Sequence, residues 1–319
     1  MLIAECCQNH LGKPEILLEM VSKGAAHGAT HLKIQGLYHE ELTFRERFEE
    51  IRSSEFSDSI VRPFEPELRR LKKLTLDFET EVAFVQECNK HEVIPMITVF
   101  THRGLDRALE AGFKSFKIAS YDCASLPLIA RILESCDELV ISTGATFWHE
   151  INSTVNLIKN KKLPSTKVTF LHAVTEYPTE IDSIRLLRMT ALKNFGFPIG
   201  FSDHTAPAST RLWASALAIK LGASAIERHF TILEPGDTKD GPVSVNCSQL
   251  RSISKMFDSP DYLDKNLPEF KITQSMLAPL YSLDPSEIEL KNRDYYRGRV
   301  ASVINGVSIP SWEVWPVET

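Results

Sequence analysis

The chain has 319 residues, a length that allows one large domain with an appendage or two domains. Its apolar fraction of 43% and charged fraction of 24% are those of an ordinary globular protein, and its formal charge of −6 argues against a general nucleic-acid binder. No apolar run reaches the length of a membrane span. Because a strand pattern begins at Leu2, we expect no signal peptide and a cytoplasmic protein.

The first hundred residues alternate strand and helix patterns around one long interruption. Strand patterns cover 2–6, 31–35 and 93–100, and helix patterns run from Pro14 to Gly28 and over 77–91. Between Gly36 and Leu74 lies a charged, aromatic-rich excursion that is longer than an ordinary connection. Since it follows a strand, it would hang on the mouth side of a barrel, where it is either a lid or a solvated insertion.

The alternation then continues to residue 258. Strand patterns recur at 115–120, 139–144, 168–174, 200–205 and 226–231, and helices are expected over 103–111, 126–133, 148–160, 184–192, 206–221 and 249–257. Eight strand–helix units in about 250 residues predict a (β/α)8 TIM barrel over residues 1–258. A doubly wound open sheet is the alternative. No Gly-x-Gly-x-x-Gly follows the first strand, so nothing supports a dinucleotide site.

Residues 259–319 are predicted to form a linker and a short appendage. Four prolines punctuate the stretch between 260 and 285. Two β-branched runs extend from Arg299 to Val314 and are separated by Asn305-Gly306. This pattern predicts a β-hairpin with a type I′ turn. Because an isolated hairpin is not stable alone, we expect it to pack on its own barrel or at a dimer interface.

The six cysteines show no spacing typical of a zinc ribbon. Cys6 and Cys7 are adjacent, which makes them a poor disulfide pair. We interpret the thiols as buried and reduced, as is usual for proteins in a reducing compartment.

Two histidines hold the same place at the ends of neighbouring predicted strands. His204 and His229 are separated by one helix-length segment, and a strand–helix–strand unit has parallel strands, so both imidazoles should meet at one mouth. Two imidazoles there can hold a divalent metal and leave positions open for substrate. The alternative is that each bonds to backbone or to a neighbouring acid, Asp203 or Glu227.

Chemistry in such a barrel takes place where the strands end. The polar residues expected there are Glu5, Lys33, Gln35, Lys117, Ser120, Ser142, Thr143, Thr175, Tyr177, Ser202, His204 and His229. Two lysines and several hydroxyl groups at one mouth suit an anionic, phosphorylated substrate, and a buried carboxylate can orient water or move a proton. Lys117 could instead form a Schiff base with a substrate. Alternatively, either lysine could serve merely as an ion-pair partner of Glu5, without contacting a substrate.

An ordered set of motifs runs through residues 1 to 258. They are Ala4-Glu5 with Asn9-His10 and Gly12, Lys33-Ile34-Gln35, Lys117-Ile118-Ala119-Ser120, Ile141-Ser142-Thr143-Gly144, Glu176-Tyr177-Pro178, Ser202-Asp203-His204-Thr205 and Glu227-Arg228-His229-Phe230-Thr231. The set resembles the sialic acid synthase family, which comprises the N-acetylneuraminate, legionaminate and pseudaminate synthases. The resemblance implies a metal-dependent transferase that condenses phosphoenolpyruvate with an open-chain N-acyl hexosamine aldehyde, giving a nonulosonic acid and phosphate.

The resemblance also implies roles for individual residues. His204 and His229 match the ligands of a divalent metal, usually manganese or magnesium. The phosphoenolpyruvate-binding positions correspond to Lys33, Lys117, Ser120, Ser142 and Ser202, and Glu5 matches the carboxylate that handles the attacking water. Gln35, Tyr177 and Asp240 match positions near the amino sugar, and Asp122, Thr143 and Thr175 complete the expected substrate-binding set.

The chain departs from the family pattern mainly around the sugar. Ala119-Ser120-Tyr121-Asp122 stands where Gly-Ser-Gly-Glu is usual, and Thr238-Lys239-Asp240-Gly241 keeps an aspartate but loses a histidine. Family synthases carry a C-terminal antifreeze-like domain that supplies an arginine to the partner's site in a swapped dimer. About 20 residues follow Arg299, so we expect no full domain of this kind. A homodimer is one expected assembly, and no nucleic-acid or membrane partner is expected.

Two other functions stay open. A 3-deoxy-ulosonate synthase that uses a phosphorylated aldose would need a second basic cluster at the mouth, for which Arg45, Arg47 and Arg62 are candidates. A barrel that binds metal and sugar without catalysis is the third possibility. The presence of Glu5 together with both lysines and both histidines counts against it.

Overall fold

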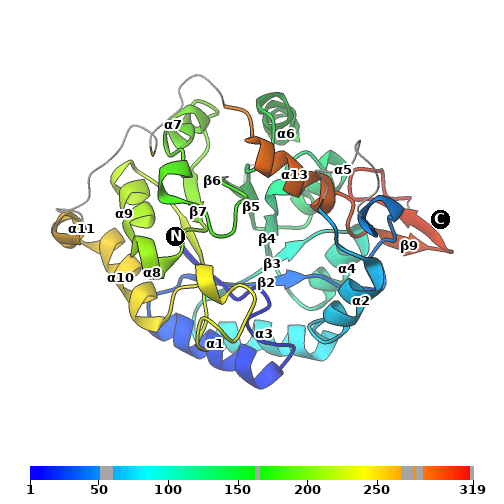
Figure 1. The fold of residues 1–319 in the computed structure, drawn as a ribbon, viewed down its shortest axis with the longest axis horizontal. Coiled ribbons are helices and arrows are strands. Elements are labelled where there is room, and N and C mark those ends of the chain that lie inside the picture. The colour runs from blue at the N-terminus through cyan, green and yellow to red at the C-terminus, as the bar shows by residue number, and fades with distance from the viewer. Residues whose placement is uncertain (51–59, 162–165, 267–275, 277–282, 317–319) are drawn as a thin grey trace.

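The computed structural model describes residues 1–50, 60–161, 166–266, 276 and 283–316. Eight parallel strands close into one barrel in sequence order (Figure 1). They are β1 (Leu2–Glu5), β2 (His31–Gly36), β3 (Ile94–Val99), β4 (Ser115–Ile118), β5 (Glu138–Ser142), β6 (Lys167–Ala173), β7 (Ile199–Asp203) and β8 (Ile226–His229). Pairing of β8 with β1 closes the barrel, from Leu2↔Ile226 to Glu5↔His229. The predicted (β/α)8 fold is confirmed, and the open sheet is excluded.

Helices surround the barrel (Figure 1). They are α1 (Pro14–Ala26), α3 (Phe78–Lys90), α4 (His102–Glu110), α5 (Leu126–Leu133), α6 (Trp148–Lys161), α7 (Leu187–Lys193), α8 (Pro207–Thr210), α9 (Trp213–Lys220), α10 (Cys247–Asp258) and α11 (Pro260–Asn266), while α2 (Phe64–Lys72) and α13 (Glu287–Tyr296) belong to the excursion and the C-terminal stretch. The single helix expected over 206–221 is two helices, because Arg211 has φ 54° and breaks the α-helical path. None of the described helices is long and apolar enough to span a membrane.

The inside of the barrel changes from apolar to polar along several of the strands. Ile3, Met96, Val140, Leu171 and Ala225 form an apolar layer inside the barrel. Because alternate residues of a strand share a face, the next inward positions are two residues further along the chain. Those positions carry Glu5, Thr98 and Ser142, which are buried. The apolar layer closes the bottom, so the polar side chains gather at the carboxyl ends of the strands.

The excursion and the C-terminal segment are joined to each other by backbone hydrogen bonds. The Thr43 amide donates to the Arg299 carbonyl at 3.0 Å, the Ala301 amide donates to the Glu41 carbonyl at 2.9 Å, and Leu42 forms an antiparallel bridge with Val300. The excursion also contains the 3-10 turns η1 (His39–Glu41) and η2 (Glu46–Phe48). Residues 51–59 of the excursion lie outside the described residues. Two segments separated by some 250 residues thus form one structure at the rim.

The predicted hairpin is present as β9 (Ser302–Ile304) and β10 (Val307–Ile309). Asn305 and Gly306 have φ of 50° and 81°, as a type I′ turn requires. The hairpin is shorter than predicted, with Pro310 directly after its second strand. It packs on its own barrel, since the Ser302 hydroxyl accepts from the Arg103 amide at 3.0 Å.

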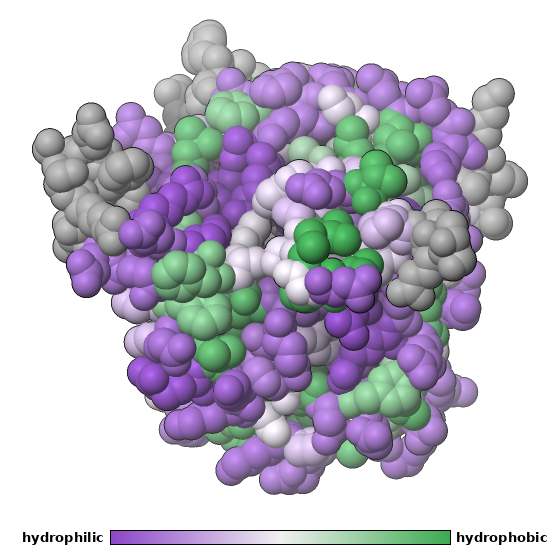
Figure 2. Space-filling view, turned by 90° about the vertical axis from the view of Figure 1, so that its right-hand side faces the viewer, coloured by the Kyte–Doolittle hydropathy of each residue, from purple (hydrophilic) through white to green (hydrophobic). Residues whose placement is uncertain are grey.

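Figure 2 shows the side of the molecule that carries the hairpin, where hydrophobic side chains form small separate groups within a hydrophilic surface. Exposed Val307 and Trp312 of the C-terminal segment are among the apolar side chains of the molecule's surface. The division at residue 258, between barrel and appendage, stays a prediction, as does the homodimer.

Candidate functional site at the barrel mouth

A chain of buried charges crosses the inside of the barrel at the carboxyl ends of the strands. The register places Glu5 opposite Lys33 on one side and opposite His229 on the other, so the three lie in one layer. The Lys33 ammonium forms an ion pair with the Glu5 carboxylate and lies 3.6 Å from a carboxylate oxygen of Glu227. It also donates to the Thr98 hydroxyl at 2.9 Å. Every member is buried, so these charges depend on one another rather than on solvent.

Lys117 lies beside this layer and has a hydroxyl partner. Its ammonium donates to Ser142 Oγ at 2.7 Å and to the Ile118 carbonyl at 3.0 Å. Burial lowers the pKa of Lys117. Burial also lowers the pKa of Lys33 to about 8, where Glu227 opposes the shift and the neighbouring Lys117 adds to it. Two ammonium groups so close together in a buried space repel each other, so both depend on nearby negative charge.

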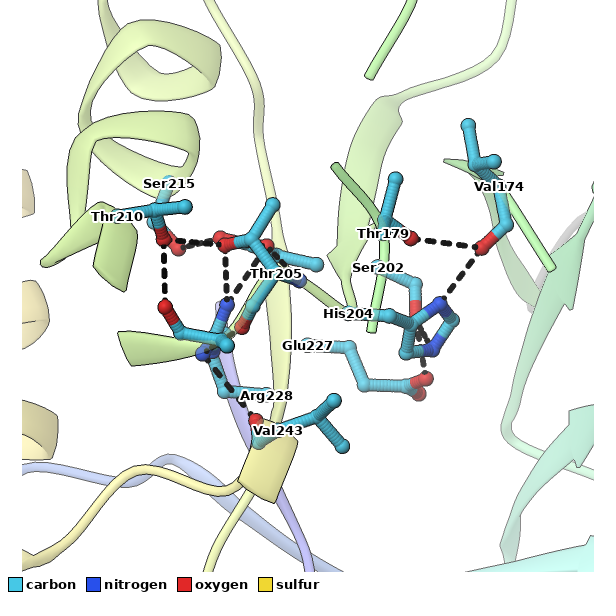
Figure 3. Close-up of polar contacts among 12 residues, drawn as sticks. Val174, Thr179, Ser202, His204, Thr205, Thr210, Ser215, Glu227, Arg228 and Val243 are labelled. Carbon is cyan, nitrogen blue, oxygen red and sulfur yellow. Dashed lines mark hydrogen bonds and ion pairs between the residues drawn. The ribbon is translucent and has the colours of Figure 1, made fainter. Parts of the chain in front are cut away.

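Glu227 is the acid that balances these lysines. Its carboxylate accepts from Ser202 Oγ at 2.7 Å. Burial pushes the pKa of Glu227 up, but the charges of Lys33 and Lys117 outweigh it and hold the pKa below its ordinary value. Figure 3 shows Glu227, Ser202 and His204 converging inside the barrel. Glu227, considered from the sequence only as an acid near His229, is therefore a member of the site itself.

His204 and His229 lie side by side at the ends of β7 and β8. Their ring centroids are 5.3 Å apart, and the Tyr177 ring lies 4.3 Å from that of His204. His204 Nδ1 is 2.9 Å from the Val174 carbonyl, an acceptor only, which assigns the proton to Nδ1. The lone pair then lies on Nε2, which is 3.3 Å from Ser202 Oγ and is the nitrogen that could bind a metal. Nδ1 of His229 is buried and has no hydrogen-bond partner among the described residues.

Both histidines are neutral near neutral pH. Burial lowers the pKa of each to about 3, and for His204 the neighbouring His229 adds to the effect. A neutral imidazole offers the lone pair that a metal ion requires. The two side chains therefore fit the ligand pair that was expected from the sequence.

Asp203 does not take part in this site. Side chains alternate along a strand, so Ser202 faces into the barrel and Asp203 faces the helices. Arg228 Nη1 lies 2.6 Å from the Asp203 carboxylate, and the Ser215 hydroxyl donates to the same carboxylate at 2.6 Å. Figure 3 shows its partners Arg228 and Ser215 apart from His204 and Glu227. Of the two acids expected beside the histidines, only Glu227 points inward.

A chamber of about 370 Å³ opens at the mouth next to His229. Four of the residues expected to bind substrate line it, namely Gln35, Asp122, Tyr177 and Asp240. Tyr177 is 49% exposed, so its ring faces open space rather than the core. Burial raises the pKa of Asp122 to about 7, against the opposing charge of Arg297. The chamber connects His229, one of the two expected metal ligands, with the expected sugar positions.

Four cationic side chains also line this chamber, namely Arg62, Arg70, Lys239 and Arg299. Glu67 pairs with Arg299, and its carboxylate lies 2.9 Å from Arg70 Nε. Of the three excursion arginines considered as a second basic cluster, only Arg62 lines the chamber.

Arg45 and Arg47 serve another purpose. Arg45 Nη2 donates to the Tyr295 carbonyl at 2.6 Å, and Arg47 forms an ion pair with Asp294 at 2.8 Å. Both side chains therefore attach the excursion to α13 instead of facing a ligand.

Of the remaining expected substrate residues, Thr143 is bonded to the protein through its side chain, whereas Ser120 and Thr175 are bonded through their backbone carbonyls. Thr143 Oγ1 donates to the Leu171 carbonyl at 3.1 Å, and the Ser120 carbonyl accepts from Thr146 at 2.9 Å. The Thr175 carbonyl accepts from the Asn292 side chain at 2.8 Å. These residues, which are buried, do not line the chamber.

The helix α13 lies against the barrel rim and was not predicted. Buried Glu289 accepts from the amides of Ala145 and Thr175, which follow β5 and β6, at 3.0 and 3.3 Å. Asn292 and Tyr296 of the same helix line the chamber. The available signal was the capping box formed by Ser286 and Glu289, in a stretch interpreted as a linker.

Comparisons with known proteins identify relatives of this chain. Residues 20–260 match the model of the NeuB family. The chain is 27% identical over 263 residues to the N,N'-diacetyllegionaminic acid synthase of Campylobacter jejuni, covering 80% of this chain and 76% of that protein. It is 24% identical over 306 residues to a pseudaminic acid synthase of Campylobacter jejuni, covering 94% and 81%.

A solved structure of an N-acetylneuraminic acid (sialic acid) synthetase from Leptospira borgpetersenii, in complex with citrate, aligns with a TM-score of 0.68. It is 25% identical in sequence, and the alignment covers 92% of this chain and 90% of that one. The resemblance seen in the motifs is thus confirmed by the family match over residues 20–260, and the chain belongs to the NeuB family.

Proposed function

We propose that this protein condenses phosphoenolpyruvate with an N-acyl hexosamine aldehyde, giving a nonulosonic acid and phosphate. One observation carries the proposal: two buried lysines, the Glu5 and Glu227 carboxylates and two neutral histidines meet at the carboxyl ends of a barrel of this family. This arrangement offers binding for a phosphorylated acid and for an aldehyde oxygen in one space.

The lysines would hold the phosphoenolpyruvate anion. Lys33 and Lys117 supply charge-assisted hydrogen bonds, and the Ser142 and Ser202 hydroxyls lie within the same network. The open-chain sugar would lie in the chamber, against Gln35 and Tyr177. Binding both substrates this way would bring the enol carbon toward the aldehyde.

The reaction forms a carbon–carbon bond between the enol carbon and the aldehyde carbon. Positive charge then develops on the carbon that bears the phosphate, water adds there, and the carbon–oxygen bond to phosphate breaks. Glu5 accepts from the Cys7 amide at 2.6 Å and pairs with Lys33, so its carboxylate is held where it can orient that water and take one of its protons. When bound by His204 and His229, a divalent metal supplies polarisation of the aldehyde oxygen.

A phosphate-release assay tests this proposal. Purified protein is given phosphoenolpyruvate, a divalent metal and a panel of N-acyl hexosamines, with reactions lacking either the sugar or the metal as controls. We expect phosphate release that depends on both additions. Binding of phosphoenolpyruvate without any release of phosphate, over the whole panel of sugars, would instead favour a non-catalytic barrel.

The cationic chamber supports a second candidate, in which the acceptor sugar carries a phosphate. Four cations line the chamber against Asp122 and Asp240, and burial reduces the negative charge of Asp122. If this candidate is correct, Lys239→Met raises the KM of a phosphorylated acceptor and leaves that of a neutral one unchanged. Lys72→Met, an exposed lysine of α2, is the matched control. Equal effects on both acceptors would reject the candidate.

A further inference from the structure

A thiol lies at the edge of this site, in the turn that follows β1. Cys7 has φ 47°, a left-handed conformation that is uncommon for a residue with a side chain. Its amide donates to the Glu5 carboxylate at 2.6 Å, which ties the turn to the catalytic layer. The side chain is 1% exposed. The backbone thus holds the Cys7 thiol at a defined place inside the mouth.

The thiol has two neighbours that are metal ligands by chemistry. Cys7 Sγ, one ring nitrogen of His229 and one carboxylate oxygen of Asp240 all lie within 4.8 Å of one another. A tetrahedral ion about 2.0–2.3 Å from each donor needs donor atoms roughly 3.5 Å apart. Small rotations of these side chains are therefore enough to close the set around one ion.

A second observation points to a ligand at the same histidine. His229 is 7% exposed, yet its Nδ1 has no hydrogen-bond partner among the described residues. A buried polar atom without a partner costs free energy unless something binds it. His204 is the next side chain along the mouth, with its ring centroid 5.3 Å from that of His229.

Cys7 differs in this respect from its neighbour Cys6. Cys6 belongs to the large apolar core of the barrel, with Leu17 and Met20. Cys7 belongs to none of the apolar clusters of the described residues, and faces an imidazole and a carboxylate instead. A packing role, which explains Cys6, does not explain Cys7.

We propose that Cys7 is a metal ligand, acting with His229 and Asp240 beside His204. The inference rests on the metal of the proposed function but not on the acceptor sugar. On binding, the thiol loses its proton to solvent and the thiolate sulfur donates a lone pair to the ion. Soft thiolate ligands favour ions such as Zn²⁺ and Co²⁺ over Mg²⁺. The site accordingly prefers a thiophilic ion, and Asp240 contacts the metal rather than only the sugar.

Cobalt titration of the full chain tests this assignment. Co²⁺ bound to a thiolate gives a sulfur-to-cobalt charge-transfer absorption in the near ultraviolet, and we expect this band to grow until one equivalent is bound. Cys7→Ser should lose the band. Cys247→Ser, which changes a thiol at the start of α10, is the matched control and should keep it. Circular dichroism is used to check that each variant is folded. If Cys7→Ser is not folded, the test is repeated with Cys7→Ala.

The same variants are compared for metal affinity by competition with a chelator. Cys7→Ser should weaken zinc binding at least about 10-fold while leaving magnesium binding within about twofold. No cobalt binding, a missing band in the natural chain, or a band that survives in Cys7→Ser would overturn the inference. If the natural chain shows the band but releases no phosphate, the Cys7 site is upheld and the proposed function is rejected. If it releases phosphate but shows no band, the proposed function is upheld and the Cys7 site is rejected.

Discussion

Replacement of Lys117 by methionine separates binding of phosphoenolpyruvate from every other property of the site. Methionine keeps the length of the side chain and removes its charge. In the folded protein the Lys117 ammonium has two partners, Ser142 Oγ and the carbonyl of Ile118, the last residue of β4. The substitution therefore leaves one hydroxyl to reorient and no buried charge without a partner.

The size of the effect follows from the lost interaction. A hydrogen bond to a charged group contributes about 1.5–3 kcal/mol. Since 1.4 kcal/mol is a factor of ten, the KM for phosphoenolpyruvate should rise about 10- to 150-fold. Because burial already lowers the pKa of Lys117, removing the charge also removes a desolvation cost, so the melting temperature should not fall.

Steady-state kinetics with each substrate varied in turn measure this effect. Lys114→Met, an exposed lysine directly before β4, is the control and should leave both KM values unchanged. If Lys117→Met changes only the KM of the sugar, the assignment of this lysine to phosphoenolpyruvate is wrong. Borohydride trapping of an imine with the natural chain would instead support a Schiff-base lysine.

Three further predictions follow from the same geometry. Because the pKa of Lys33 is lowered to about 8, its charge is lost as the pH rises through that value, so phosphoenolpyruvate should bind less tightly above pH 8. The Lys33→Arg variant should keep its affinity for phosphoenolpyruvate above pH 8. An unchanged KM for phosphoenolpyruvate across this pH range in the natural chain would contradict the role of Lys33 in binding it. Asp203→Ala should cost about 3–5 kcal/mol in urea unfolding, since it leaves Arg228 buried without its partner, and a cost below about 1 kcal/mol would refute this. His204→Ala and His229→Ala should each abolish turnover while circular dichroism stays unchanged, and full activity of chelator-treated protein would count against a metal at these residues.

The barrel and its catalytic layer could be predicted because both depend on short-range regularities. Strand and helix periods identified the eight units, and parallel strands bring their carboxyl ends together, which places Glu5, Lys33 and His229 in one layer. Asp203, considered from the sequence only as an acid near His204, shows what the strand period decides. It precedes His204 by one residue, and the period of two sends it to the opposite face.

The upper part of the site could not be predicted in this way. Arg70, Lys239 and Arg299 come from three distant segments, and no local pattern in the sequence links them. Their meeting depends on how the excursion and α13 pack over the rim, which is a tertiary property. Cys7 was interpreted as a buried thiol, which its exposure confirms, but its neighbours His229 and Asp240 are visible only in the folded chain.

The central claim, condensation of phosphoenolpyruvate at this mouth, is tested most directly by following the bridging oxygen of that substrate. Phosphoenolpyruvate labelled with ¹⁸O between carbon and phosphorus is incubated with the protein, a divalent metal and the N-acyl hexosamine that supports phosphate release best. Mass spectrometry then locates the label. We predict labelled phosphate and an equal amount of unlabelled nonulosonic acid, because the carbon–oxygen bond breaks. Pyruvate as the only organic product, or no phosphate with any acceptor, would contradict the claim.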